Sequence, residues 1–297
     1  MQSAELQQVE WRCFDGLQLD LTRGCSTGCQ YCSLADGFSP QQLDITKLLE
    51  GPVPDKPVYM SPRSDAFAPE ALPLTRKLLR KWLPEGAKIT FITKQLIPDD
   101  VIELLAQHRK QIGMEYSLAR MDEKLSAYIE PKAPSPRTRL QVLANLHDAG
   151  FTPLVRLNPI FPSIDDTEEA LTAILDAYQN AGVKHIRTGY VVIRNSDHPQ
   201  LRQQRDAILA HPVFSQAWDY MTETIKIERG RGNTLPFEQR KEKYRQIQEM
   251  SEQREMHASV CADLDLQISH TDGIGVCCEK KIKNSPRPAV QLTFGRT

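Results

Sequence analysis

The sequence predicts an α/β fold, a partial (β/α)6 barrel of the TIM type with a helical, cysteine-bearing C-terminal extension. Six short apolar runs suited to strands recur in the first two thirds of the 297-residue chain. Amphipathic helical patterns lie between these runs, which is typical of parallel strands joined by crossovers. From residue 199 onward the pattern becomes helical and polar. We therefore expect a barrel over residues 1–198 and an extension over 199–297 that carries a candidate second metal site.

The expected strands are short apolar runs bounded by polar or turn residues. They cover residues 17–22, 57–61, 88–93, 114–119, 153–160 and 185–193. The expected helices repeat apolar residues every three to four positions, and two of them close on a glycine, a common helix end. They cover residues 70–83, 98–110, 136–150 and 166–182. In folds of this kind, chemistry takes place at the carboxyl ends of the strands.

Composition excludes several classes of protein. A net charge of −1 gives no global basic field that would attract nucleic acid or a membrane. No stretch approaches the roughly 18 consecutive apolar residues of a membrane span, and the N-terminus does not resemble a signal peptide. We therefore expect a cytoplasmic protein whose thiols stay reduced. Seven cysteines, an odd number, also disfavour a disulfide framework.

Three cysteines are crowded into the stretch RGCSTGCQYCS, residues 23–33. Cys25, Cys29 and Cys32 have the spacing C-x3-C-x2-C and directly follow the first expected strand. Zinc sites usually combine one cysteine pair with a second pair later in the chain. Three thiolates from one loop suit a [4Fe–4S] cluster with one open iron, where a reactant can bind. A zinc loop or a plain redox cluster is the alternative.

This spacing, with the aromatic Tyr31 before the third cysteine of a (β/α) barrel, resembles the radical S-adenosylmethionine (SAM) superfamily. The resemblance implies that SAM binds the open iron through its amino and carboxylate groups. It implies that an electron from the reduced cluster cleaves SAM to a 5′-deoxyadenosyl radical, which abstracts hydrogen from a substrate. An electron donor such as flavodoxin or ferredoxin would then be a partner.

The stretch YMSPRSDAFAPE, residues 59–70, replaces the glycine-rich motif common in that superfamily. Together with ITK at 92–94 and EYSLARMDEKL at 115–125, it resembles the spore photoproduct lyase-like branch. In that branch a serine–aspartate pair, a lysine and a second serine contact SAM. These positions correspond here to Ser64, Asp65, Lys94 and Ser117.

Elementary chemistry agrees with this assignment, because the SAM carboxylate needs a cation and hydroxyl donors. Lys94 and Ser117 would lie at the ends of neighbouring strands. Taken singly, each of the four positions fits a turn hydroxyl or a solvated charge equally well. Arg156 and Asn158 alternate with apolar neighbours along the expected strand 153–160. They are candidates to hold SAM or substrate, or they form a polar face near the barrel mouth.

One difference from the spore photoproduct lyase-like branch concerns the substrate. Lyases that repair the thymine spore lesion carry a hydrogen-donor cysteine immediately before the serine, where this chain has Arg63. We therefore expect a peptide or small-molecule substrate and disfavour nucleic acid, and the subclass, lyase or oxidoreductase, stays open. Two alternatives remain: a nucleic-acid lesion repair lyase, and a non-catalytic zinc or Fe–S interaction protein.

Three of the four remaining cysteines lie near the C-terminus. Cys261, Cys277 and Cys278 are candidate metal ligands within a segment that has few apolar residues to hold it in place. Three interpretations are open: a second Fe–S cluster, a zinc site, or metal-free thiols, one of which donates a hydrogen atom. His257 and His270 lie nearby and are interpreted as structural.

Overall fold

The computed structural model describes residues 2–10, 14–32, 39–227 and 230–261 of the chain. Its main feature is a sheet of eight strands in the order β1-β2-β5-β6-β7-β8-β9-β13. Strands β2 to β13 of this sheet pair in parallel, and β1 pairs antiparallel with β2. The bounds are β1 Gln7–Glu10, β2 Asp15–Leu19, β5 Val58–Met60, β6 Ile89–Thr93, β7 Ile112–Ser117, β8 Leu154–Ile160, β9 His185–Tyr190 and β13 His257–Val260.

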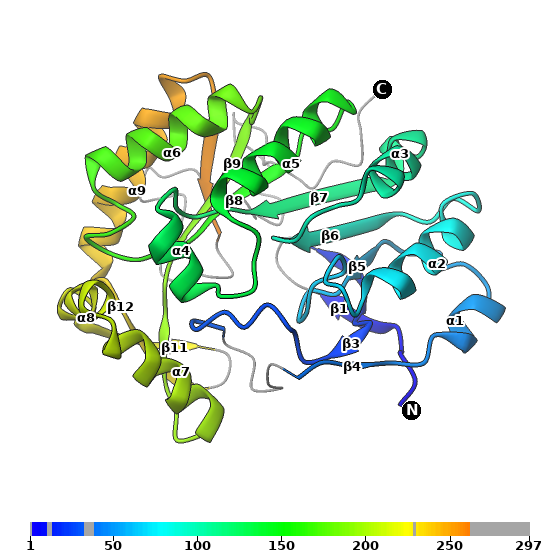
Figure 1. The fold of residues 1–297 in the computed structure, drawn as a ribbon, viewed down its shortest axis with the longest axis horizontal. Coiled ribbons are helices and arrows are strands. Elements are labelled where there is room, and N and C mark those ends of the chain that lie inside the picture. The colour runs from blue at the N-terminus through cyan, green and yellow to red at the C-terminus, as the bar shows by residue number, and fades with distance from the viewer. Residues whose placement is uncertain (1, 11–13, 33–38, 228–229, 262–297) are drawn as a thin grey trace.

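The predicted α/β class is confirmed, and all six expected strands form, as β2 and β5 to β9. Within the described residues the edge strands β1 and β13 do not pair with each other, so the barrel is open rather than closed. Figure 1 shows helices on the outer side of the curved sheet, with residues 24–32 crossing its inner side in blue. These helices are α2 Leu72–Trp82, α3 Asp99–Gln107, α5 Pro136–Asp148 and α6 Glu168–Asn180.

The starts of several helices follow from their first residues. Ser135 caps α5, where its side chain accepts a hydrogen bond from the backbone of Thr138, and Thr167 caps α6 in the same way. Asp122 caps α4, Glu123–Ile129, a helix that the sequence pattern did not predict because it is only seven residues long. The short α1 (Thr46–Glu50), η1 (Arg109–Gln111), β3 (Thr22–Arg23) and β4 (Gln41–Gln42) complete the N-terminal part.

The parallel strands are buried on both faces, as expected for a sheet covered by crossover helices. All six residues of β7, Ile112–Ser117, are buried, including the carboxylate of Glu115 and the hydroxyl of Ser117. Since buried polar groups need partners, these two residues mark the inner side of the barrel as a polar region. The apolar core lies between the strands and the outer helices, and its buried members include Phe91, Tyr116 and Leu105.

The segment from residue 193 onward differs from the expected helical extension. It contains α7 Pro199–Ala210, α8 Pro212–Asp219 and α9 Phe237–Glu252, but also the antiparallel sheet β10-β12-β11. The bounds of these strands are β10 Ile193–Asn195, β12 Gly230–Thr234 and β11 Glu223–Ile227. The strand β13 then joins the main sheet beside β9. Such short strands form through pairing with distant partners, which a local polar pattern does not reveal.

None of the described helices is long and apolar enough to cross a membrane.

The packing predicts a large difference between two leucines near β6. Leu105 of α3 is fully buried, whereas Leu96 is 49% exposed. We expect Leu105→Ala to lower the free energy of unfolding by about 2–5 kcal/mol, because a cavity remains in the core. Leu96→Ala, the matched control, should change it by no more than about 0.5 kcal/mol. Urea unfolding followed by circular dichroism measures both, and equal losses would contradict the described packing.

Candidate active site at the carboxyl edge of the sheet

A cavity of about 460 Å³ lies at the carboxyl ends of the parallel strands. Side chains from residues 31–32, from the ends of β5 to β9 and from the sheet β10-β12-β11 line it. The structure brings together all the residues that the sequence suggested as SAM contacts. Tyr31, Ser64, Asp65, Lys94, Ser117, Arg156 and Asn158 all line this one cavity, as do Cys32 and Tyr190.

The three cysteines of the C-x3-C-x2-C motif lie on the loop of residues 24–32, here named the cluster loop. Cys29 is buried, and Cys25 and Cys32 are partly exposed. Gly28 has a φ of +71°, a left-handed conformation that glycine adopts without strain, so it allows the chain to turn between Cys25 and Cys29. The Cys32 backbone N–H then donates to the Cys29 carbonyl at 3.1 Å, which closes a tight turn.

The cluster loop is anchored on two sides by distant parts of the chain. The backbone N–H and hydroxyl of Ser26 donate to the two carboxylate oxygens of Glu70 at 3.1 and 2.8 Å. On the other side, the buried Gln204 of α7 donates through Nε2 to the Cys29 carbonyl at 3.2 Å. Residues on both sides therefore fix the loop backbone before any ligand binds.

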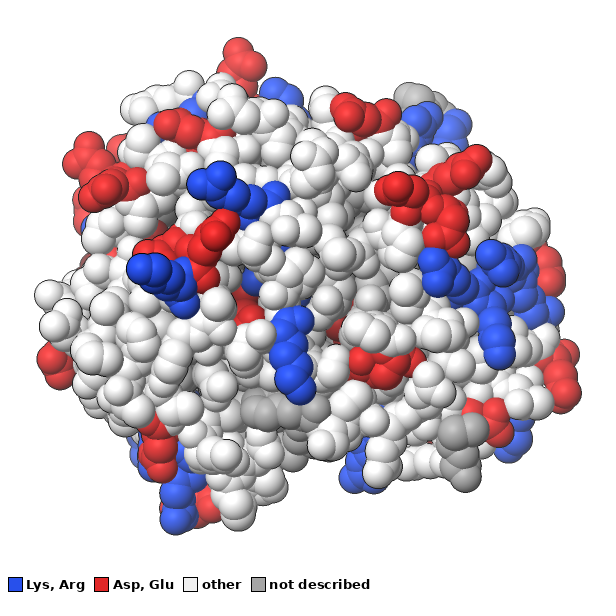
Figure 2. Space-filling model, viewed as in Figure 1, with Lys and Arg blue, Asp and Glu red and all other residues white. Residues whose placement is uncertain are grey.

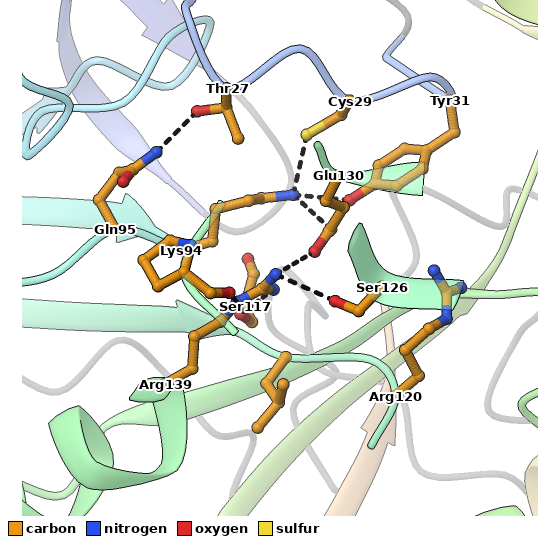
Figure 3. Close-up of polar contacts among 12 residues, drawn as sticks. Thr27, Cys29, Tyr31, Lys94, Gln95, Ser117, Arg120, Ser126, Glu130 and Arg139 are labelled. Carbon is orange, nitrogen blue, oxygen red and sulfur yellow. Dashed lines mark hydrogen bonds and ion pairs between the residues drawn. The ribbon is translucent and has the colours of Figure 1, made fainter. Parts of the chain in front are cut away.

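A buried charged network joins the cluster loop to the sheet (Figure 3). Lys94 Nζ, at the end of β6, donates to Glu130 Oε1 at 2.8 Å and lies 2.6 Å from the Tyr31 hydroxyl. It also lies 3.3 Å from Cys29 Sγ. The Tyr31 hydroxyl donates to Glu130 as well, and Arg139 NH2 donates to the second Glu130 oxygen at 2.5 Å. One carboxylate thus holds two cations and a phenol.

The charges in this network stabilise one another. Burial by itself would raise the pKa of Glu130, but Lys94 and Arg139 hold it well below its ordinary value. Burial would lower the pKa of Lys94, but its neighbours Cys29 and Glu130 raise it well above its ordinary value. Both groups are therefore charged at neutral pH. Glu130 also ends helix α4, where a lone carboxylate would be unfavourable, so the two cations are needed to keep it there.

The donor set of the cluster loop fits an iron–sulfur cluster. Burial raises the pKa of the Cys25 and Cys29 thiols, while the Lys94 ammonium beside Cys29 favours its thiolate, the form that binds iron. In the described part of the chain, no three His, Cys, Asp or Glu side chains are grouped so as to hold a single metal ion. A cubane cluster binds each thiolate at a different iron, so it does not require such a tight group.

The cavity wall also offers a hydroxyl that lacks a partner. Ser64 Oγ is buried, and within the described residues it forms no hydrogen bond. A buried polar atom without a partner is costly unless a ligand or water supplies one, so Ser64 fits a role in ligand binding. Its neighbour Asp65 is different. Its carboxylate accepts bonds from the Thr93 hydroxyl at 2.7 Å and from the Lys94 N–H at 3.1 Å, which ties the β5 loop to β6.

Three further polar residues, Arg120, Tyr190 and Arg63, have defined hydrogen-bond partners. The Arg120 guanidinium forms two hydrogen bonds to Asp165, at 3.0 and 2.7 Å, and does not line the cavity. Tyr190 lines the cavity, and its hydroxyl donates to Asp166 at 2.8 Å. Arg63 turns to Asp20, with Nε 2.8 Å from Oδ2. The side chain at this position is therefore used in an ion pair.

Cys261 is the one C-terminal cysteine within the described residues. It is buried at the end of β13, and its N–H donates to the Thr188 carbonyl at 3.2 Å, which places it inside the sheet beside β9. Cys277, Cys278 and His270 lie outside the described residues. The second metal site therefore stays a prediction.

Sequence reasoning missed two carboxylates of this site, Glu130 and Glu115. Glu130 stands in an unremarkable turn-like stretch, YIEPKAPS, and no spacing links it to Lys94. Glu115 is enclosed by apolar residues in IGMEYS, and a charge within such a run is a signal for a buried, partnered group. Its partners, Arg156 and Arg187, lie on the neighbouring strands β8 and β9.

Sequence comparisons find relatives over part of the chain. No protein-family description matches the sequence. An uncharacterized protein of Acidianus two-tailed virus is 34% identical over 134 residues, 44% of this chain and 44% of that protein. An uncharacterized protein of Methanocaldococcus jannaschii is 26% identical over 160 residues, 49% of this chain and 60% of that protein. The chain thus spans about half the length of these curated relatives.

Among solved structures, spore photoproduct lyase has a similar fold, with a TM-score of 0.64 and 14% sequence identity. The likeness covers 86% of this chain and 78% of the lyase. A second structure of that lyase, with bound AdoMet and dinucleoside spore photoproduct, gives a TM-score of 0.62 at 13% identity. At such low identity the likeness shows a shared fold.

The Glu130 network predicts a pH-dependent loss of stability. We expect Glu130→Gln to lower the free energy of unfolding by about 3–5 kcal/mol at pH 7, because Lys94 and Arg139 then lose their shared counter-charge. A carboxylate whose pKa is lowered by folding stabilises the protein above its unfolded pKa of about 4.3. The difference in the free energy of unfolding between the parent and Glu130→Gln should therefore shrink as the pH falls below about 4.

Urea unfolding at a series of pH values measures this difference. Glu123→Gln serves as the control, since Glu123 is exposed and, among the residues that the structure describes, forms an ion pair with the exposed Arg137 alone. It should change stability by no more than about 0.5 kcal/mol. A Glu130→Gln effect of the same size as the control, or one that does not vary with pH, would contradict the network.

Proposed function

We propose that this protein is a radical SAM enzyme acting on a peptide or small molecule. The observation that carries the proposal is the meeting of the cluster loop with the polar strand ends at one cavity. Cys32 and Tyr31 of the loop line the same space as Ser64, Lys94 and Ser117. An amino acid bound to a cluster requires thiols that hold the cluster, and a cation and hydroxyls that bind its carboxylate. The cluster loop and the cavity beside it offer both.

In this proposal Cys25, Cys29 and Cys32 hold a [4Fe–4S] cluster, and SAM binds at its open iron. When bound, the cluster and SAM together supply a 5′-deoxyadenosyl radical that abstracts hydrogen from the substrate. The electron comes from a cytoplasmic donor such as a flavodoxin or ferredoxin. The net reaction, that of a lyase or an oxidoreductase, depends on whether Cys261, Cys277 and Cys278 hold a second Fe–S cluster.

The residues of this chain provide binding and orientation. Ser64 and Ser117 supply hydroxyl donors to the carboxylate of SAM, and Lys94 supplies the positive charge at that end of the cavity. Lys94 already donates to Glu130, so its ammonium is held at the cluster loop rather than left to move. Asp65 fixes the β5 loop, and the Tyr31 ring stands next to Cys32. Arg156 and Asn158 lie further along the cavity wall on β8.

A nucleic-acid lesion repair lyase is the second candidate. Two observations favour it: the fold shared with spore photoproduct lyase, and the dinucleoside spore photoproduct bound in one structure of that enzyme. Arg63 argues against this candidate, because Arg63 occupies the position at which such lyases carry the hydrogen-donor cysteine. In addition, acidic and basic side chains are interspersed on the face shown in Figure 2. This candidate predicts DNA binding that weakens steeply with salt.

Metal analysis and SAM turnover test the proposal. We expect the anaerobically reconstituted chain to contain about four irons and sulfides, or about eight if a second cluster is present. The Cys25→Ala/Cys29→Ala/Cys32→Ala variant should lose about four of them. With a reductant, the parent should convert SAM to 5′-deoxyadenosine and methionine, and the triple variant should not.

Cys261→Ala is the matched control for the triple variant. It should keep SAM cleavage, and a loss of about four irons in this variant would assign Cys261 to a second cluster. Zinc in place of iron in the parent, with no SAM cleavage, would support the non-catalytic interaction protein and overturn the proposal.

A further inference from the structure

A carboxylate on β7 faces two guanidinium groups inside the barrel. Glu115 is 1% exposed, and its two oxygens accept bonds from Arg156 NH1 and Arg187 NH1, each at 2.9 Å. Arg156 and Arg187 are direct neighbours across the β8–β9 ladder. Like charges side by side on a sheet repel each other, so Glu115 is what allows the two arginines to lie together.

Of the two arginines, Arg156 reaches the cavity. Its side chain is 14% exposed and lines the cavity, whereas that of Arg187 is 2% exposed. Within the described part of the chain, the hydrogen bond to Glu115 is the only one formed by the Arg156 side chain. A guanidinium has five N–H donors and always carries its charge, so most of its donors remain for a ligand.

The charges around the cavity do not balance. Of the lining residues whose charge partners the structure describes, two are cations, Lys94 and Arg156, and one is a carboxylate, Asp65. The Asp65 carboxylate accepts hydrogen bonds from β6, and Lys94 is paired with Glu130. Arg156 shares its counter-charge with Arg187. A partly compensated charge in a half-enclosed cavity favours an anion as its ligand.

The position of Arg156 separates this anion from the SAM carboxylate. In the proposed function SAM would bind the open iron through its carboxylate, and the loop that would hold the cluster lies beside Lys94 at the end of β6. Arg156 lies on β8, two strands away in the sheet. Two strand spacings of about 4.8 Å put it roughly 10 Å further along the wall. Tyr190 of β9 and Ile227 of β11 line the cavity together with it.

We propose that Arg156 binds an anionic group of the substrate, a carboxylate or a phosphate, at the β8–β9 side of the cavity. This inference rests on the proposed function and names the chemical class of its substrate. The guanidinium fork forms two parallel hydrogen bonds to either group. The anion fixes the orientation of the substrate, and the uncharged part next to it faces the cluster end of the cavity.

Anion binding to the reconstituted full chain with saturating SAM tests the proposal. The probes are inorganic phosphate and malonate, titrated calorimetrically at constant ionic strength against the parent, Arg156→Gln, Arg156→Lys and the control Arg137→Gln. We expect the parent to bind one probe better than the other, which identifies phosphate or carboxylate as the preferred group. Arg156→Gln should weaken that binding at least about tenfold, a change of ~1.4 kcal/mol.

Arg156→Lys should restore part of the affinity, because it keeps the charge but not the fork. Arg137→Gln, at an 86% exposed position, should bind like the parent. Arg156→Gln should fold, since Arg187 still neutralises Glu115, and circular dichroism together with iron content checks this. Iron content and SAM cleavage of the parent are measured beside the titrations. Failure of the proposed function can therefore be distinguished from failure of the anion-binding inference.

Two outcomes would overturn the inference. The first is a parent that holds iron and cleaves SAM but binds neither probe. The second is an Arg156→Gln variant that loses affinity for SAM as strongly as for the probe, because Arg156 would then serve the SAM carboxylate. Selective loss of probe affinity in that variant, with SAM affinity retained, would support it.

Discussion

One buried ammonium, Lys94 Nζ, joins the parts of the chain that meet at the cluster end of the cavity. It extends from the end of β6 to Cys29 and Tyr31 of the cluster loop and to Glu130 at the end of α4. Arg139 of α5 holds the other oxygen of Glu130. Because a buried charge is stable only with its partners in place, these elements adopt their relative positions together.

This network also determines the electrostatic character of the site. Two cations and one carboxylate leave one positive charge beside three thiols that must become thiolates to bind iron. The positive charge therefore lies where the negative charge of a cluster would develop. The backbone that carries these thiols is held by contacts such as that from the Gln204 side chain to the Cys29 carbonyl.

At the other side of the cavity, Glu115 repeats the same principle with the same balance of charges. One carboxylate holds two arginines, and only Arg156 faces the cavity. The two carboxylates, Glu130 and Glu115, thus fix a cation at each of two places about two strands apart. In the proposed function the first serves the cluster and SAM, and the second selects the substrate by its charge.

The sequence by itself determined the α/β class, the six parallel strands and the cysteine loop, because hydrophobic period and ligand spacing are local properties. It also marked seven of the residues that line the cavity, since polar residues at the ends of apolar strands must gather at one edge. Only the tertiary structure decided that Lys94 pairs with Glu130, that Gln204 supports Cys29 and that β13 joins the sheet beside β9. Each of these contacts links segments far apart in the chain, and its energy depends on burial and distance, which no local pattern encodes.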